Sequence, residues 1–265
     1  MRIATWNVNS VRARLERVVG YLTRRQIDVL ALQETKVKDA DFPLAAFEEA
    51  GYQVAHWGLD QYNGVAIASR LGLAAIERGF AGQPTWTGRA GQPRLEARAL
   101  AASCGPLRLW SLYVPHGRAL GDPHMAYKLA FLGALRQVAA SSLASDAGAS
   151  VALLGDWNVA PFDSDVWDIT AFAGSTHVSV PERQAFEALA GLGYREVSRE
   201  YVPGVGQYTY WDYQQSRWAR GQGMRIDFAY CSPALADKVT EVVICSGERE
   251  GEGASDHVPV EVEID

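Results

Sequence analysis

Short apolar or alternating segments recur along this chain, and several of them end in polar residues that a hydrophobic core has no need of. Because successive side chains of a strand point to opposite faces, such segments predict the strands of buried sheets. Six of these strand ends are Trp6-Asn7, Gln33-Glu34, Tyr113-Val114-Pro115-His116, Asp156-Trp157-Asn158, Arg225-Ile226-Asp227 and Ser255-Asp256-His257. The repetition predicts that strand ends far apart in the sequence build one polar site.

Residues 150–161 show this pattern most clearly. Four apolar residues at 151–154 predict a strand buried on both faces, and Gly155 then permits a turn without a steric penalty. Asp156 and Asn158 are two residues apart, so in extended chain they point the same way. A carboxylate and a carboxamide would then face one point at the mouth of a sheet. Glycine, aspartate and asparagine are also common in turns, so this segment could instead be an ordinary turn.

The remaining segments predict further strands and a few amphipathic helices. We expect a helix capped by Asn9 or Ser10, a long Ala- and Leu-rich helix at residues 125–145, and another beginning near Pro181. Residues 159–180 lack periodicity and predict a long loop. Other strands are expected at 52–57, 64–69, 73–79, 94–101, 107–114, 225–231, 239–245 and 258–264. The pattern favours two packed sheets with helices outside them.

Composition narrows the class of protein. The 265 residues can bury a large core, in one domain or two, and no run of about eighteen apolar residues or secretory leader is present, so we expect a cytoplasmic protein without a membrane contact. Cys104, Cys231 and Cys245 are too few and scattered for a disulfide framework or a zinc site. A net charge of −6 disfavours a protein that merely coats nucleic acid, but not an enzyme with a local arginine patch and a bound cation.

Asp227 is unusual because it lies inside an apolar strand, between Ile226 and Phe228. A buried carboxylate is costly unless it is paired. His257 is the candidate partner, and the carboxylate would then fix the tautomer of the imidazole. A purely structural Asp–His pair is the less favoured alternative.

Together the polar clusters hold the side chains that a hard cation prefers. Their carboxylates, carboxamides and phenol are Glu34, Asp156, Asp227, Asp256, Asn7, Asn158 and Tyr113. Oxygen ligands suit Mg²⁺ or Mn²⁺, whereas the clusters contain no cysteine and no histidine pair at the spacing of a zinc site. Neither a serine nucleophile elbow nor a glycine-rich phosphate loop is present. Metal-assisted hydrolysis of a phosphate ester uses such a set.

At these positions the chain resembles the exonuclease III family of AP endonucleases and exodeoxyribonucleases, within the endonuclease/exonuclease/phosphatase superfamily. The matching segments are Trp6-Asn7-Val8-Asn9, Leu32-Gln33-Glu34-Thr35-Lys36, Tyr113-Val114-Pro115, Gly155-Asp156-Trp157-Asn158, Tyr210-Trp211-Asp212-Tyr213, Arg225-Ile226-Asp227 and Ser255-Asp256-His257. The resemblance implies one α/β domain over residues 1–265: a four-layer αββα sandwich of two mixed β-sheets packed face to face, with helices outside and the active site at one end of the sheets.

The resemblance also implies a metal site and a catalytic set. Mg²⁺ is the expected cofactor, with Mn²⁺ as a possible substitute, and Glu34 would be its main ligand. The candidate metal ligands are Asn7, Glu34, Asp156, Asn158, Asp256 and His257.

Each catalytic position has an implied role. Asp156 would orient or deprotonate the attacking water, while Asn158 and Tyr113 would hold the oxygens of the scissile phosphate. His257, oriented by Asp227, would stabilise the developing charge or donate a proton.

Substrate contacts follow from the same resemblance. Tyr210, Trp211, Met224 and Ile226 match the region that shapes a pocket for a sugar without a base, which would exclude an intact nucleotide by size. Candidate contacts to the DNA backbone are Arg12, Arg89, Arg94, Arg118, Lys128, Arg217 and Arg220, together with His116, which stands where the family commonly has an amide.

The implied activity is Mg²⁺-dependent hydrolysis of phosphodiesters in double-stranded DNA by a monomer. The substrates would be abasic sites, blocked 3′-ends and plain 3′-ends, through AP-endonuclease, 3′-end-cleaning and 3′-to-5′ exonuclease activities. One alternative is a superfamily phosphatase, phospholipase or nonspecific deoxyribonuclease, which should lack Trp211-Asp212-Tyr213. A catalytically inactive DNA-binding module is the other, and the filled catalytic positions disfavour it.

Overall fold

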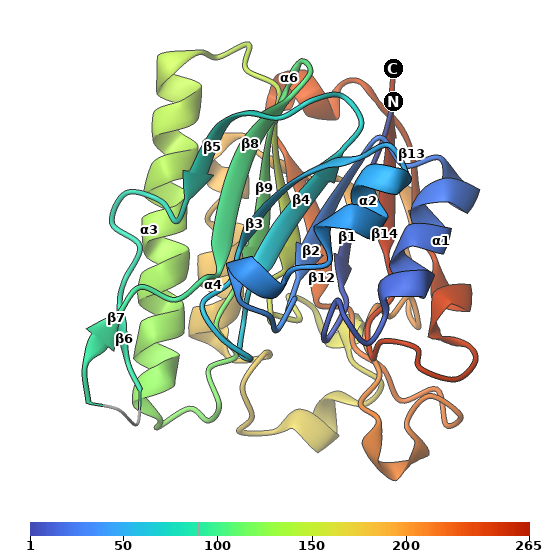
Figure 1. Ribbon diagram of the computed structural model, residues 1–265. Coiled ribbons are helices and arrows are strands. Elements are labelled where there is room, and N and C mark those ends of the chain that lie inside the picture. Colours follow the sequence, from blue (N-terminus) through green and yellow to red (C-terminus); the bar gives the residue numbers. More distant parts are fainter. Residues whose placement is uncertain (89–90) are drawn as a thin grey trace.

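The computed structural model describes residues 1–88 and 91–265 and contains two six-stranded sheets packed face to face (Figure 1). The first sheet has the order β13 (Val239–Ile244), β14 (Val260–Ile264), β1 (Arg2–Asn7), β2 (Val29–Gln33), β4 (Val65–Ser69), β3 (Gln53–Trp57). The second has the order β11 (Arg195–Glu196), β12 (Asp227–Cys231), β10 (Val151–Asp156), β9 (Leu107–Tyr113), β8 (Ala99–Cys104), β5 (Ala74–Arg78). Arg89, a candidate DNA contact, lies outside the described residues.

Helices cover the outer faces of both sheets. Helices α1 (Leu15–Arg25) and α2 (Leu44–Glu49) pack on the first sheet, while α3 (Pro123–Ser145) and α4 (Val180–Glu187) pack on the second (Figure 1). The predicted four-layer αββα sandwich is therefore confirmed. The short elements are β6 (Trp86–Thr87), β7 (Pro93–Arg94), α5 (Val197–Tyr201) and α6 (Pro233–Ala236). Among the described residues, no helix is both long and apolar enough to cross a bilayer.

The core lies between the two sheets and is built from the inward side chains of their strands. Ile3, Val29 and Val262 of the first sheet meet Leu154 and Ala229 of the second, and none of the five is more than 1% exposed. Full burial of an aliphatic side chain contributes about 1.5–3 kcal/mol. This shared core fixes how the ends of one sheet lie against the ends of the other.

Strand direction brings the predicted polar ends together. Strand β1 runs parallel to β2, with Asn7 beside Gln33, and β9 runs parallel to β10, with Tyr113 beside Asp156. Strand β12 is antiparallel to β10 and begins at Asp227, directly opposite Asp156. Because parallel strands end at one edge of a sheet, these polar residues gather at one end of the sandwich.

Several predicted elements begin later in the structure than expected, and two of them show a physical reason. Helix α1 begins at Leu15 without a side-chain cap, because Asn9 and Ser10 have positive φ angles and the Asn9 amide donates to Asp256 instead. Strand β8 begins at Ala99 rather than residue 94, since the preceding residues form the buried Arg98–Glu96 ion pair (2.6 Å).

Gly155 is a strand residue, not the predicted turn, and it is needed because β9 passes close by. A Cβ at this position would lie 1.9 Å from the backbone oxygen of Leu112.

We expect Gly155→Ala to lower the free energy of unfolding by about 1–3 kcal/mol or more, because neither the β9 nor the β10 backbone can move freely. Gly133→Ala, at an exposed position of α3, meets nothing within 4 Å and should be neutral or stabilising. Equal unfolding midpoints in denaturant for the two variants would contradict this account.

Candidate active site

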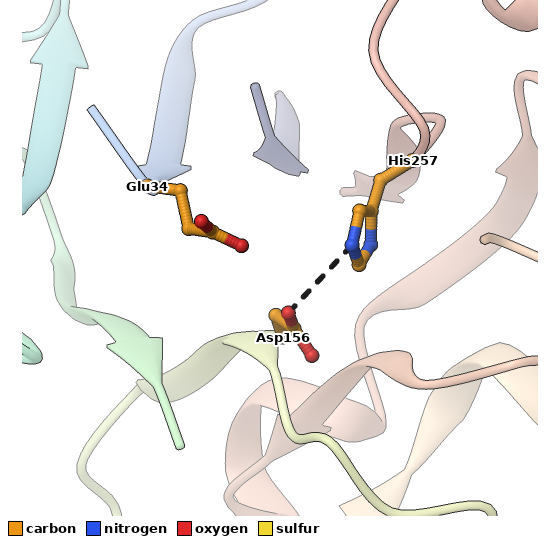
Figure 2. Close-up of side chains that lie close together, drawn as sticks. All are labelled: Glu34, Asp156 and His257. Carbon is orange, nitrogen blue, oxygen red and sulfur yellow. Dashed lines mark ion pairs between the residues drawn. The ribbon is translucent and has the colours of Figure 1, made fainter. Parts of the chain in front are cut away.

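Three side chains from separate parts of the chain converge at this end of the sandwich. Glu34 follows β2, Asp156 ends β10 and His257 precedes β14, and Figure 2 shows all three facing one space. One ligand atom from each lies within 4.8 Å of the others. The structure thus brings together the predicted core of the site.

Asn7 joins the two carboxylates of this cluster. Its amide nitrogen donates to Glu34 Oε1 and to Asp156 Oδ2, both at 2.9 Å, while its oxygen accepts from the backbone N–H of Asn9. The Lys36 ammonium lies 2.7 Å from Glu34 Oε2. Burial opposes ionisation of Glu34, but Lys36 and Asn7 lower its pKa overall, so the group is a carboxylate.

The predicted Asp227–His257 pair is confirmed. His257 Nδ1 donates to Asp227 Oδ2 at 2.8 Å, and the Thr209 hydroxyl donates to the same oxygen at 2.6 Å. His257 Nε2 then faces Asp156 Oδ2 at 3.8 Å. Burial disfavours the imidazolium, yet Asp227 and the nearby carboxylates raise the pKa of His257 to about 10. His257 is therefore held in one orientation as a cation and can donate a proton.

Asp156 is the opposite case, a carboxyl group that is hard to ionise. Burial, with Asp227 and Glu34 adding to it, raises the pKa of Asp156 to about 7, while His257 and Asn7 oppose the shift. A pKa near the operating pH suits a general base. A bound divalent cation would lower the pKa of Asp156 again and favour the carboxylate.

Tyr113 and Asn158 lie beside the cluster. Burial raises the pKa of Tyr113 well above its usual range, and Glu34 and Asp156 add to the shift, so the residue stays a neutral phenol that can donate. Asn158 follows the strand end with a φ of 50° and donates from its amide nitrogen to the Val114 carbonyl at 2.9 Å. Its backbone N–H donates to Asp156 Oδ1 at 2.9 Å.

Asp256 is not part of the cluster that Glu34, Asp156 and His257 form. Its carboxylate accepts from the Asn9 amide at 3.1 Å, and the neighbouring Ser255 hydroxyl donates to the backbone oxygen of Asn7 at 2.8 Å. Asn9 and Lys36 were not predicted as site residues, although both stand within quoted motifs. Thr209 was also missed, and no pattern in the sequence marks it.

A cavity of about 400 Å³ opens beside His257. Tyr210 lies between the two, with its ring centroid 4.7 Å from that of His257, and Met224 forms part of the wall. The predicted pocket residue Trp211 is buried against Tyr208 and Trp218 instead, and Ile226 packs in the apolar cluster with Met224. Other residues of the wall are Trp167, Phe172, His116, His177, Arg118 and Arg217.

The predicted DNA contact of Lys128 is wrong. Its side chain is 0% exposed and its ammonium is paired with Glu182, so it cannot reach a duplex. Arg118 and His116 do line the cavity, and their contact with DNA stays a prediction.

The cluster has the chemistry of a site for a divalent metal. Glu34 and Asp156 supply carboxylate oxygens, and the Asn7 amide lies between them. His257 Nε2, a predicted ligand, faces the same space, but as a protonated imidazole it would donate a hydrogen bond rather than ligate. Oxygen-rich groups of this kind suit a hard cation.

Comparison with known proteins agrees with this geometry. Residues 4–257 match the model of the Endonuclease/Exonuclease/phosphatase family, which is nearly the whole chain. The chain therefore belongs to this family.

Proteins that are similar along the whole chain indicate which activity within the family this chain has. Exodeoxyribonuclease III of Haemophilus influenzae is 29% identical over 275 residues, covering 100% of both chains. A solved structure of the 3′ phosphatase NExo from Neisseria, bound to a product DNA hairpin, is 34% identical with a TM-score of 0.92, covering 100% of this chain and 99% of that one. An AP endonuclease from Archaeoglobus fulgidus is 31% identical with a TM-score of 0.91 and the same coverage. With such relatives along its full length, the chain is a hydrolytic nuclease.

Proposed function

We propose that this nuclease hydrolyses phosphodiesters and phosphomonoesters at damaged sites and 3′-ends of double-stranded DNA, with Mg²⁺ as its cofactor and Mn²⁺ as a substitute. The observation that carries the proposal is the convergence of Glu34, Asp156 and His257 beside a cavity large enough for a sugar. Relatives of this chain are named as an exodeoxyribonuclease, a 3′ phosphatase and an AP endonuclease, and these names support this range of substrates.

The side chains have complementary roles in this reaction. Asp156, a carboxylate in the presence of the cation, accepts the proton of the attacking water and orients it. The Tyr113 hydroxyl and the Asn158 amide hold non-bridging phosphate oxygens, and His257 stabilises the developing charge or protonates the leaving oxygen. A divalent ion held by Glu34, with Asn7 and Asp256 in support, would supply Lewis-acid stabilisation of the phosphate.

Three further features belong to the proposal. We take residues 1–265 as one catalytic domain, because both sheets contribute to the site. We expect a monomer, since Glu34, Asp156 and His257 all come from one chain. The free state of Cys104, Cys231 and Cys245 suits the reducing cytoplasm.

A gel assay tests the proposal and ranks its activities. Three duplexes, carrying an abasic site, a 3′-phosphate or a plain 3′-end, are incubated with the enzyme and Mg²⁺, beside an inositol phosphate as the alternative substrate. We expect product from the DNA substrates, and none after the metal is chelated. Turnover of the inositol phosphate alone would contradict the proposal, as would activity that survives chelation.

Metal binding should also be visible in stability without any substrate. An ion at 100 times its Kd stabilises the folded state by about 2.7 kcal/mol, which corresponds to a rise in Tm of roughly 5–10 °C for a chain of this size. We expect Mg²⁺ or Mn²⁺ to raise Tm in this way at constant ionic strength, and Glu34→Gln to lose most of the rise. A similar rise in the variant would show that the ion binds elsewhere.

A further inference from the structure

Lys128 on α3 and Glu182 in the first turn of α4 form an ion pair in which both side chains are 0% exposed. Removing two charges from water can cost more than their attraction returns, and apolar residues of similar volume are often as stable or more so. Stability alone therefore does not explain the pair, and its contacts indicate another role.

The pair joins three segments that wall the active site. The Lys128 ammonium donates to the backbone oxygen of Asn158 at 2.5 Å and lies 3.4 Å from the backbone oxygen of His116. Glu182 Oε1 accepts from the Thr176 hydroxyl at 2.8 Å and from the backbone N–H of His177 at 2.9 Å. One buried pair thus ties together the exits of β9 and β10 and the segment before α4.

Asn158 is the residue most dependent on this pair. Its φ of 50° lies in the left-handed region, which asparagine adopts more readily than other non-glycine residues, and contacts to both sides of its peptide hold it there. Its backbone oxygen accepts from Lys128 and its backbone N–H donates to Asp156 Oδ1 at 2.9 Å. If the ammonium is removed, the Asn158 peptide loses its charged donor, and both its amide and the Asp156 carboxylate can shift.

His177 and His116 link the Asn158 carbonyl to the cavity through two hydrogen bonds. The Asn158 carbonyl can only accept, so His177 Nδ1 carries the proton of their 2.6 Å hydrogen bond. Burial, followed by Lys128, lowers the pKa of His177 well below its usual range, and its neutral Nε2 accepts from His116 Nε2 at 3.2 Å. His116 Nδ1 then accepts from the backbone N–H of Arg118 at 3.0 Å. The tautomers of both rings follow from the fixed Asn158 carbonyl.

We propose that Lys128 and Glu182 are positioning residues, which hold Asn158 and the adjoining wall of the cavity in the geometry that hydrolysis needs. The inference rests on the proposed function, since Asn158 matters only if it contacts the scissile phosphate. A misplacement of catalytic groups by about 1 Å can lower a rate 100-fold.

The test uses the double variant Lys128→Met with Glu182→Gln, which leaves no uncompensated charge in the core. With Mg²⁺ and a 3′-phosphate duplex, we expect kcat to fall by about 10- to 100-fold while KM changes by less than about threefold. Wild-type kcat in the folded double variant would overturn the inference. If that variant does not fold, Glu182→Gln alone serves, with a smaller fall in kcat expected and an unchanged kcat as the contrary result.

A double-mutant cycle with Asn158→Ala separates positioning from a general structural effect. If the pair acts mainly through the Asn158 side chain, its replacement in the Asn158→Ala background should lower kcat far less than it does in the wild type, because only the contacts to Asp156 and the cavity wall then remain to be lost, whereas independent effects would multiply. If Asn158→Ala itself leaves cleavage intact, the role proposed for Asn158 in the reaction fails. If only the Lys128–Glu182 change is without effect, the inference fails and the proposed function stands.

The matched control is the Arg25–Glu261 pair beneath α1, with an N–O distance of 2.7 Å and Glu261 3% exposed. Arg25→Met with Glu261→Gln removes an ion pair outside the site; Glu261 is buried as Glu182 is, whereas the Arg25 side chain is 42% exposed. We expect wild-type kcat and KM for this variant at temperatures where it is folded. An equal fall in kcat in the control would contradict a positioning role specific to Lys128 and Glu182.

Discussion

Glu34→Gln and Asp156→Asn should each lower kcat on a 3′-phosphate duplex by about 100-fold or more while the protein stays folded. Each change keeps the size of the side chain and removes one negative charge from the cluster. Glu34→Gln weakens the proposed metal site, so high Mg²⁺ concentrations should restore part of the activity. Asp156→Asn removes the base itself, because an amide cannot accept the proton of water, and added metal should not restore it.

Steady-state rates over a series of Mg²⁺ concentrations distinguish the two variants. Glu16→Gln, an exposed carboxylate on α1, is the matched control and should have wild-type rates. Wild-type turnover in either site variant would remove the role given to that carboxylate. Equal rescue of both by Mg²⁺ would show that Asp156 acts only through the metal.

Asp227→Asn should have the second large effect, a fall in kcat of about 100- to 10,000-fold with a much smaller change in KM. A change of this kind at an aspartate that orients a catalytic histidine leaves the geometry nearly intact but favours the wrong tautomer. Asp227 also raises the pKa of His257, so the variant should lose the protonated imidazole at a lower pH than the wild type. Rates measured between pH 6 and about 10 would show this shift.

Asp28→Asn is a suitable control for that experiment. Asp28 is a hydrogen-bonded carboxylate that accepts from the Arg2 backbone and pairs with Arg70 at 2.7 Å, beside the start of β2 rather than its end. It should lose stability without losing turnover. An unchanged turnover number in Asp227→Asn would leave the Asp227–His257 pair as a structural feature only.

Much of the fold and the catalytic cluster could be predicted because both depend on short-range patterns. Apolar alternation marks the strands, and Asn7, Glu34, Asp156 and His257 each stand at a strand end within a recognisable motif. Parallel pairing of β1 with β2 and of β9 with β10 then brings these ends together. Asp227 was predictable for another reason, because a carboxylate inside an apolar strand needs a partner.

Side-chain direction and loop geometry could not be predicted in the same way. Lys128 stands in a helix whose sequence does not show which face is buried, and its partner Glu182 is 54 residues away. Trp211 and Tyr210 are adjacent, yet only Tyr210 lines the cavity, because the backbone of Trp211 donates to Asp256 and its ring packs against Trp218. Such choices depend on contacts between distant segments.

The proposed function requires a divalent cation bound at the Glu34 and Asp156 carboxylates, in the space that His257 faces. Anomalous scattering from crystals soaked in Mn²⁺ tests it most directly, because manganese can be located without reference to activity. We predict a strong anomalous peak in direct contact with a Glu34 carboxylate oxygen and beside Asp156, which is lost in Glu34→Gln. A peak at a separate surface, or one that persists unchanged in the variant, would contradict the claim.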